Sequence, residues 1–175
     1  MSTALGLCGS LRAASFNRQL MQEAGRMFGG LTEGDLRLPL YDGDLEAEKG
    51  IPTEVTTLAD KIAGASAVII ATPEYNKAPS GVFKNALDWV SRVPGGVWKD
   101  KPVALMSATA GRAGGERAQF ALRLWMMPFG ADVLTGPEVL VGQAQDQFRD
   151  GRLINEINLK MLEQLMDNLR VKAGS

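Results

Sequence analysis

The sequence predicts an α/β fold in which helices cover both faces of a parallel β-sheet. Short apolar runs alternate with longer amphipathic segments five times along the chain, which is the pattern of strand–helix–strand units joined by right-handed crossovers. Residues 67–71 are an unbroken β-prone run, as expected of a central parallel strand covered on both faces. With 175 residues, 45% of them hydrophobic and 22% charged, the chain suits one domain over residues 1–175 with a substantial core.

Each element is predicted from local patterning. Residues 3–8 form an apolar first strand, and residues 16–28 form an amphipathic helix that Ser15 caps and Gly29 ends. Alternating polar and apolar residues predict the second strand at 35–38, and a loop is expected at 39–52. Further helices are expected at 53–64, 82–93, 116–127 and 153–171, and further strands at 67–71, 103–107 and, as two pieces of a last strand, 132–134 and 138–141.

Five parallel strands and a closing C-terminal helix favour the flavodoxin-like three-layer sandwich, with strand order 2-1-3-4-5. In such a sheet, ligands bind beyond the carboxyl ends of the strands, at the switch point between strands 1 and 3. Loops rich in glycine and polar residues follow strands 1, 3 and 4 in this sequence. These three loops are therefore expected to meet at one edge of the sheet.

The composition excludes several kinds of site. Lys+Arg 19 against Asp+Glu 20 gives a net charge of −1, which argues against nucleic-acid binding and against a polybasic membrane contact. The chain has no histidine, which excludes a Ser-His-Asp triad and histidine-ligated zinc, and no metal site is expected. A single cysteine, Cys8, together with the lack of a signal-peptide pattern and of an apolar run of about 18 residues, predicts a cytoplasmic protein.

The first of the three loops, within residues 9–18, predicts an anion site. Ser10 and Ser15 offer hydroxyl groups. Arg12 offers a planar charged fork and Asn17 an amide, at the start of a helix whose dipole favours negative charge. The spacing matches neither the nucleoside-triphosphate loop nor the dinucleotide fingerprint, so a terminal monophosphate is the expected ligand. Alternatively, Ser15 is only a helix cap, Arg12 a surface charge and Asn17 an ordinary helix-start residue.

The second and third loops suit a flat ring. Residues 72–81 combine prolines, an aromatic ring and amides that can present a polar edge to a heterocycle. Within them, a structural or oligomer-contact role is favoured for Glu74 over acid–base chemistry, and packing or stacking is favoured for Tyr75. Residues 107–115 are small and expected to be flexible, which leaves room for a ring. Alternatively, their glycines only mark a loop between two elements.

Four blocks in matching order resemble the NADPH-dependent FMN reductase family, and within it the bacterial quinone and chromate reductases. They are Gly9-Ser10-Leu11-Arg12 with Ser15 and Asn17, Pro73-Glu74-Tyr75-Asn76, Lys84-Asn85-Ala86-Leu87-Asp88-Trp89, and Gly114-Gly115 with Arg117-Ala118-Gln119. The resemblance spans about residues 3–140. It departs from the family pattern at Ser80 and Ala110, where proline is commoner, and at Cys8, where another small residue is usual.

The resemblance implies a flavodoxin-like fold with non-covalent FMN and NADPH or NADH as electron donor. By position, the FMN phosphate would be held by Ser10, Arg12, Ser15 and Asn17. The isoalloxazine and ribityl chain would be lined by Pro73, Glu74, Tyr75 and Asn76. The other side of the ring would be contacted by Ser107, Thr109 and Gly111, largely through their backbone. No catalytic side chain is expected, because the flavin carries the chemistry.

The resemblance also implies a homodimer or homotetramer formed through the helices after strands 3 and 4. The apolar surface of residues 82–93 and the cluster at 125–127 are available for that contact, although the cluster could equally belong to the core. The expected function is an NAD(P)H-dependent flavin oxidoreductase that passes electrons through FMN to a quinone, a free flavin or a similar small acceptor. The alternatives are an FMN-binding electron carrier or redox sensor without steady turnover, and a cofactor-free interaction domain on the same fold.

Overall fold

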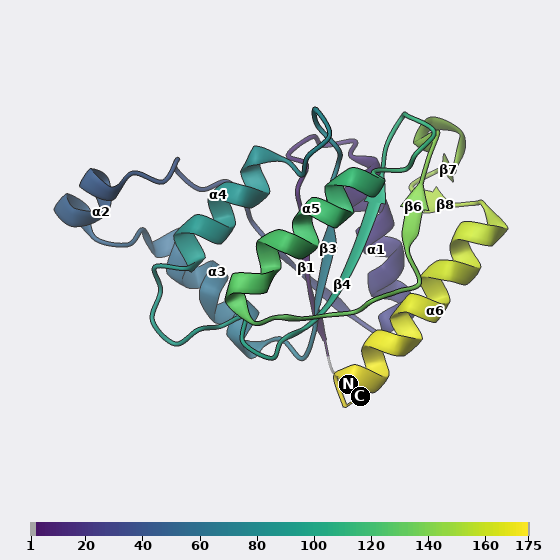
Figure 1. Ribbon diagram of the computed structural model, residues 1–175. Coiled ribbons are helices and arrows are strands. Elements are labelled where there is room, and N and C mark those ends of the chain that lie inside the picture. The colour runs from purple at the N-terminus through teal and green to yellow at the C-terminus, as the bar shows by residue number, and fades with distance from the viewer. Residues whose placement is uncertain (1–2, 175) are drawn as a thin grey trace.

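A computed structural model describes residues 3–174, and Figure 1 shows them as a three-layer α/β sandwich. The central sheet is parallel with the order β2-β1-β3-β4-β5, and β6 pairs with β4 beyond the end of β5. The predicted order 2-1-3-4-5 is confirmed, including the division of the last strand into two pieces. Met1, Ser2 and Ser175, which belong to the expected single domain, lie outside the described range.

The strands are β1 (Ala4–Cys8), β2 (Leu31–Gly34), β3 (Val68–Ala71), β4 (Pro102–Ala108), β5 (Asp132–Val133) and β6 (Val139–Val141), with a separate antiparallel hairpin of β7 (Phe148–Arg149) and β8 (Arg152–Leu153). The helices are α1 (Phe16–Phe28), α2 (Gly43–Lys49), α3 (Thr53–Gly64), α4 (Gly81–Val90), α5 (Glu116–Met126) and α6 (Glu156–Lys172). Two short 3₁₀ turns, η1 (Met127–Phe129) and η2 (Ala144–Asp146), complete the secondary structure of residues 3–174.

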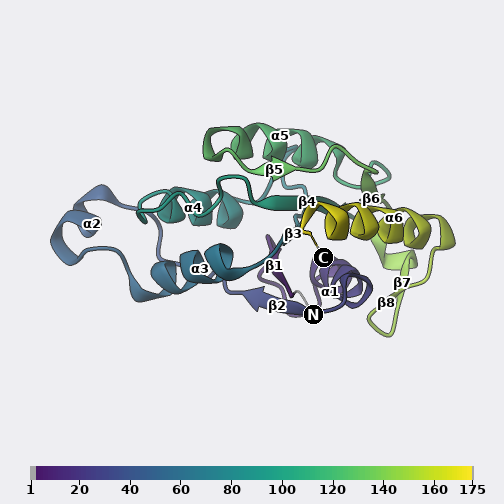
Figure 2. The same ribbon diagram turned by 90° about the horizontal axis from the view of Figure 1, so that it is seen from below.

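Each face of the sheet has its own apolar core, because successive strand residues point to opposite sides. α1 and α6 pack on one face, whereas α3, α4 and α5 pack on the other (Figure 2). The α1 side is lined largely by small strand residues such as Ala4, Ala71 and Ala108. These residues let α1 lie close to the sheet, which brings its first turn beside the carboxyl ends of the strands.

The prediction of a strand at residues 35–38 is wrong, because the strand lies at 31–34. Gly29, with a φ of 112°, turns the chain back directly after α1, so that Leu31 pairs with Ala4 and Gly34 with Leu7. The alternation that suggested a later strand arises because Leu36 is buried under α3 and α4 after the strand has ended.

Residues 39–52, predicted as a loop, contain the short helix α2. Asp42 caps it by accepting a hydrogen bond from the Asp44 amide at 2.9 Å, and none of its residues is buried. Figure 1 shows α2 standing away from the sheet. The chain leading into it is held at Pro39, whose carbonyl accepts hydrogen bonds from Asn85 Nδ2 at 2.9 Å and Trp89 Nε1 at 2.8 Å.

Two predicted helix boundaries differ from the structure by three residues. α4 ends at Val90 rather than 93, because the chain continues in tighter turns with hydrogen bonds between residues three apart. α6 begins at Glu156 rather than 153, because Leu153 pairs with Phe148 in the β7–β8 hairpin.

Glu23 of α1 is buried and bonded by two arginines. Arg152 of β8 donates to its carboxylate from Nε at 2.7 Å and from Nη2 at 3.0 Å, and Arg26 donates at 2.6 Å. Burial acts to raise the pKa of Glu23, but the hydrogen bonds from Arg152 and Arg26 outweigh it, so this pKa lies below its ordinary value of 4.5. The ion pair fastens the β7–β8 hairpin to α1.

Glu23→Gln is expected to lower the free energy of unfolding by about 1–3 kcal/mol at neutral pH, because the charge-assisted hydrogen bonds are lost. A carboxyl group with a lowered folded-state pKa stabilises fully above its unfolded pKa, and this stabilisation is lost as the pH falls through the folded pKa. Urea denaturation measures the free energy of unfolding, and the difference in this quantity between wild type and Glu23→Gln should narrow from about pH 7 to about pH 3.

The control is Asp88→Asn, which removes the exposed Lys84–Asp88 pair on α4 and should change stability less. A difference for Glu23→Gln that stayed constant across this pH range would contradict an ionic role for Glu23.

Candidate cofactor site

Three loops meet beyond the carboxyl ends of β1, β3 and β4 and line a cavity of about 320 Å³. This arrangement confirms the expected convergence at the switch point of the sheet. Nine of the eleven predicted residues line the cavity: Ser10, Arg12, Ser15, Asn17, Pro73, Glu74, Tyr75, Thr109 and Gly111. Phe16, Ala108 and Ala110, which the sequence did not single out, line it too, whereas Asn76 and Ser107 lie outside the lining.

Gly9 is the point at which the first and second loops cross. Its amide donates to the Ala71 carbonyl at 2.8 Å, which continues the pairing of β1 with β3. A Cβ atom at Gly9 would lie 2.9 Å from Ser80 Oγ and 3.1 Å from Thr72 Oγ1. Glycine is therefore needed here for the close approach of the two loops, rather than for an unusual φ.

The first loop contributes the polar groups of Ser10, Arg12 and Ser15 to the cavity lining. Ser10 and Ser15 are both buried, and Ser15 Oγ accepts a hydrogen bond from the Arg18 amide at 3.3 Å, which confirms Ser15 as the cap of α1. The Arg12 side chain is exposed at the rim. On the outer side of the loop, Arg37 Nη2 donates to the Leu11 carbonyl at 3.2 Å. This contact fixes the loop without using the inward-facing groups.

Asn17 joins the start of α1 to the end of β4. Its Nδ2 donates to the Ala108 carbonyl at 2.8 Å, and its Oδ1 accepts from the Ala108 amide at 2.9 Å. The side chain that was expected to reach a phosphate thus makes a two-way bond to the backbone. What this part of the chain offers to an anion is the N–H groups of Phe16 and Asn17 in the first turn of α1, since that of Arg18 is bonded to Ser15 Oγ.

Cys8 lies directly beneath the first loop and is buried. Its Sγ donates to the Ser10 carbonyl at 3.5 Å and lies 3.9 Å from Ser15 Oγ. Burial raises the pKa of the Cys8 thiol above its ordinary value of 9.0. The thiol is therefore protonated at neutral pH and supports the loop as a small side chain instead of acting as a nucleophile.

The second loop ends in a tight turn at the mouth of the cavity. The amide of Tyr75 donates to the carbonyl of Ala78 at 2.9 Å, and the amide of Ala78 returns a bond to Tyr75 at 3.1 Å. Between them, Asn76 and Lys77 have φ of 51° and 66°, the pattern of a type I′ turn. This geometry places Asn76 at the tip of the turn, outside the cavity lining, and leaves Tyr75 half-exposed at the mouth.

Glu74 connects the second loop to α5, which is a structural role of the kind the sequence favoured. The cap residue of α5 is Gly115, which has no side chain, and Glu74 Oε2 instead accepts a hydrogen bond from the Ala118 amide at 3.2 Å. A carboxylate at this position also interacts favourably with the helix dipole.

Glu74→Ala is expected to lower the free energy of unfolding by about 1–2 kcal/mol, because the Ala118 amide loses its acceptor. Glu74→Gln keeps an acceptor oxygen and should retain most of that stability. The matched control is Glu116→Ala, which removes an exposed negative charge from the same helix turn. Thermal unfolding compares the variants, and a glutamine variant as unstable as the alanine variant would contradict the hydrogen-bonding role.

The third loop, expected to be flexible, is held by the segment that follows β6. The amide of Thr109 donates to Val141 at 2.9 Å, and the amide of Ala144 donates back to Thr109 at 3.0 Å. The Gly111 carbonyl accepts from the Gln143 amide at 3.1 Å. The expectation of a flexible segment is therefore wrong at these points, and the small side chains leave room in a fixed loop.

Ser107, at the end of β4, faces away from the cavity. It is fully buried, its Oγ donates to the Gly114 carbonyl at 2.5 Å, and it accepts from Gln119 Nε2 at 2.9 Å. The resemblance placed Ser107 beside the ring largely through its backbone, and in the structure its side chain supports the third loop from behind.

A larger groove, of about 560 Å³, lies at the opposite end of the sheet, beside the chain segments that precede β4 and β5. Its walls include the apolar side chains of Val93, Val97 and Phe129. Among the residues that the structure describes, no charged side chain lines this groove, and its one hydroxyl group, that of Ser91, donates to the Asp88 carbonyl at 2.6 Å. Within residues 3–174, no helix is long and apolar enough to cross a membrane.

Comparisons with known proteins agree with this geometry. Residues 2–146 match the family described as NADPH-dependent FMN reductase. The chain is 38% identical over 172 residues to an NAD(P)H-dependent FMN reductase of Pseudomonas aeruginosa, covering 95% of this chain and 92% of that protein. It is 36% identical over 163 residues to a quinone reductase of Escherichia coli K12, covering 89% of this chain and 87% of that protein.

Among solved structures, FerB from Paracoccus denitrificans, a flavoenzyme NAD(P)H:(acceptor) oxidoreductase, matches with a TM-score of 0.87 and 31% identity over 99% of this chain and 98% of that chain. The family match, the two relatives and this structure cover nearly the same length of chain. The chain therefore belongs to the NADPH-dependent FMN reductase family.

Proposed function

We propose that this protein is an NAD(P)H-dependent flavin oxidoreductase that holds FMN non-covalently in the cavity formed by the three loops. The observation that carries the proposal is the composition of this cavity, in which the first loop contributes hydroxyl groups and a guanidinium and the third loop contributes small side chains. When bound, FMN supplies hydride acceptance from NAD(P)H and electron transfer to a quinone, a free flavin or a similar small acceptor.

The residues of the first loop fit a phosphate group. Ser10 and Ser15 offer hydroxyl groups at the cavity, Arg12 reaches it from the rim, and Phe16 and Asn17 of the first turn of α1 line it. A terminal phosphate is a dianion with several acceptor oxygens, so it can use all of these donors. Asn17 would act indirectly, by fixing the first turn of α1 to Ala108.

The residues of the second and third loops fit a flat ring. Pro73 and Tyr75 form one wall, and Thr109, Ala110 and Gly111 form another with little side-chain bulk. Asn76 would contribute through the turn that orients Tyr75, and Ser107 through its support of the third loop.

The chain binds and orients rather than supplying acid–base groups. Glu74 lines the cavity, but its carboxylate is bonded to the start of α5, and the Cys8 thiol is protonated. Proton exchange with water is sufficient for quinone and flavin acceptors, so no catalytic side chain is assigned.

Steady-state oxidation of NADH and NADPH by the purified protein, with quinones, free flavin, chromate and azo dyes as acceptors, tests the proposal. We expect a yellow protein, or one that gains a flavin spectrum on adding FMN, with sustained turnover of at least one acceptor. A flavin spectrum without turnover would indicate an electron carrier instead. A protein that gained no flavin spectrum would refute FMN binding.

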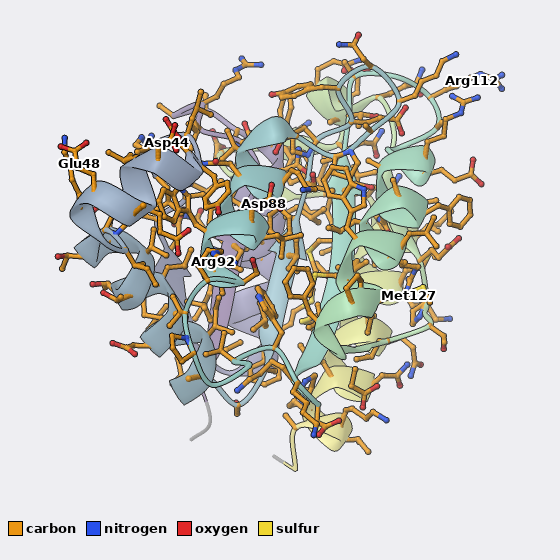
Figure 3. The ribbon with its side chains drawn as sticks, turned by 60° about the vertical axis from the view of Figure 1, so that its left-hand side comes forward. Asp44, Glu48, Asp88, Arg92, Arg112 and Met127 are labelled. Atoms are coloured by element: carbon orange, nitrogen blue, oxygen red, sulfur yellow. The ribbon has the colours of Figure 1, made fainter. Side chains whose placement is uncertain are left out.

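We further propose that the protein forms a homodimer or homotetramer in the cytoplasm. The α4 surface that the sequence offered for this contact is mostly core, since Phe83, Leu87 and Trp89 are buried. In the second candidate, the cluster at 125–127, Met126 is buried in the core but Met127 is exposed. Phe120 and Leu124 of α5 are exposed too, and Figure 3 shows Met127 on the outer side of this face. A second copy that covered these side chains would remove an apolar stripe from water. Light scattering measures the molar mass of the protein in solution and hence its oligomeric state. Leu124→Glu should shift this state toward the monomer.

A further inference from the structure

Two consecutive residues at the start of α5 hold the two loops that line the ring end of the cavity. The Ala118 amide holds the second loop through Glu74, as described above. The side chain of the next residue, Gln119, is buried and donates from Nε2 to Ser107 Oγ and to the Val139 carbonyl, both at 2.9 Å. The first turn of α5 therefore connects the second loop, the end of β4 and β6.

The bond from Gln119 to Ser107 continues to the third loop. An amide nitrogen can only donate, so Ser107 Oγ accepts from Gln119, and its single proton is directed to the Gly114 carbonyl. The next peptide is crowded against the same hydroxyl, since a Cβ atom at Gly115 would lie 2.7 Å from Ser107 Oγ. Gln119 and Ser107 thus set the turn at Gly114 and Gly115, where both φ angles are positive.

The cost of burying Gln119 indicates that it does more than fill space. Among residues 3–174, its Oε1 is one of two buried side-chain polar atoms without a hydrogen-bond partner, and Trp98 Nε1 is the other. A buried unpartnered acceptor carries its full desolvation cost. An apolar side chain of similar length, such as methionine, would avoid this cost at the same position. The two donated bonds are what glutamine adds there.

We propose that Gln119 is a positioning residue for the flavin ring. Through Ser107 it fixes the Gly114–Gly115 turn at one end of the third loop, while the contacts with residues 141–144 fix the other end. Thr109 and Gly111 make the contacts with residues 141–144 themselves, and together with Ala110 they line the cavity just before the Gly114–Gly115 turn. The inference rests on the proposed function, because it concerns how the same cavity receives FMN.

The test compares Gln119→Met with Arg123→Met, a matched control on the same helix. Arg123 Nη1 also donates to a backbone carbonyl, that of Leu134 at 2.6 Å, but it lies about one turn farther along α5 from the loops. Dissociation constants for FMN and for riboflavin, the flavin without phosphate, are measured by fluorescence titration. The absorption maximum of the bound flavin reports the surroundings of the ring.

Gln119→Met is expected to weaken FMN and riboflavin binding by the same factor, about tenfold, and to shift the absorption maximum. The ratio of the two constants should stay at the wild-type value, because the phosphate end is untouched. Arg123→Met should lower the thermal midpoint but leave both constants and the absorption maximum near wild type. Wild-type constants and spectrum in Gln119→Met would overturn the proposal, as would a loss confined to FMN.

Whether Gln119 acts through Ser107 is tested with Ser107→Ala and with the double variant that combines Ser107→Ala and Gln119→Met. If Gln119 works through this hydroxyl, Gln119→Met should add little to the loss already caused by Ser107→Ala. If the loss of flavin affinity in the double variant equalled the product of the two single losses, the proposed action of Gln119 through Ser107 would be overturned. If Gln119→Met does not fold, Ser107→Ala tests the proposal by itself. Riboflavin binding at the wild-type affinity in Ser107→Ala would refute the proposal. If the wild-type protein binds neither flavin, the proposed function itself is refuted, whereas unaltered binding in the variants refutes only this inference.

Discussion

Replacing Arg12 with alanine is expected to weaken FMN binding by about 10- to 100-fold, because a charge-assisted hydrogen bond contributes about 1.5–3 kcal/mol and each 1.4 kcal/mol is tenfold. Arg12 is exposed at the rim of the cavity, at the end where Ser10 and Ser15 place their hydroxyl groups. Riboflavin has no phosphate, so its affinity should change little. Fluorescence titration of the two flavins with wild type and variant measures both values.

The control for this prediction is Lys77→Ala, which removes a positive charge from the tip of the second loop. A general effect of charge near the cavity mouth would weaken FMN binding in both variants to a similar extent. A specific phosphate contact predicts a large loss for Arg12→Ala alone. Unchanged FMN affinity in Arg12→Ala would mean that the phosphate is held elsewhere.

Gly114→Ala is expected to lower the free energy of unfolding by about 2–5 kcal/mol, from left-handed strain of about 1–2 kcal/mol and a steric clash of about 1–3 kcal/mol. Gly114 has a φ of 63°, and a Cβ atom there would lie 2.5 Å from the carbonyl carbon of Leu140. That atom belongs to the backbone of β6, which pairs with β4 and cannot move as a side chain can. Urea denaturation measures the loss.

Gly96→Ala separates the two contributions. Gly96 has a similar φ of 59°, but a Cβ atom there meets nothing within 4 Å. This variant should show only the conformational strain, about 1–2 kcal/mol. Equal losses in the two variants would show that crowding against β6 is unimportant. The steric contribution should also weaken FMN binding, because Gly114 begins the turn that Ser107 supports.

The sheet order could be predicted from sequence because it depends on the regular alternation of apolar strands and amphipathic helices. α1 was predicted with its cap, since Ser15 and Gly29 are local signals at both of its ends. β2 was misplaced because residues 31–34 carry one apolar side chain, and their strand depends on pairing with β1. The β7–β8 hairpin was missed because it depends on long-range contacts, namely the Arg152–Glu23 pair and the stacking of Phe148 on Phe16.

The site was predictable to the level of loops, but not of side-chain direction. Loop membership follows from position after a strand, so the cavity-lining residues could be anticipated. The orientation of Asn17 toward Ala108, and of Ser107 toward Gly114, depends on how α1 and the third loop pack on β4. Gln119 had two signals in the sequence. It belongs to one of the four blocks that resemble the family, and it is a polar residue beside Ala118 and about one helical turn before Leu122 on the buried side of α5.

α2 has a consequence for how the molecule responds to labelling and proteolysis. None of its residues is buried, so it can unfold locally without exposing apolar core, and its amides should exchange with deuterium well before those of β1 or β3. The first cut by a protease is expected within residues 43–49. Figure 3 shows Glu48 at the outer edge of this helix, where a cysteine-linked fluorophore would report on encounters with other molecules while leaving the cavity undisturbed.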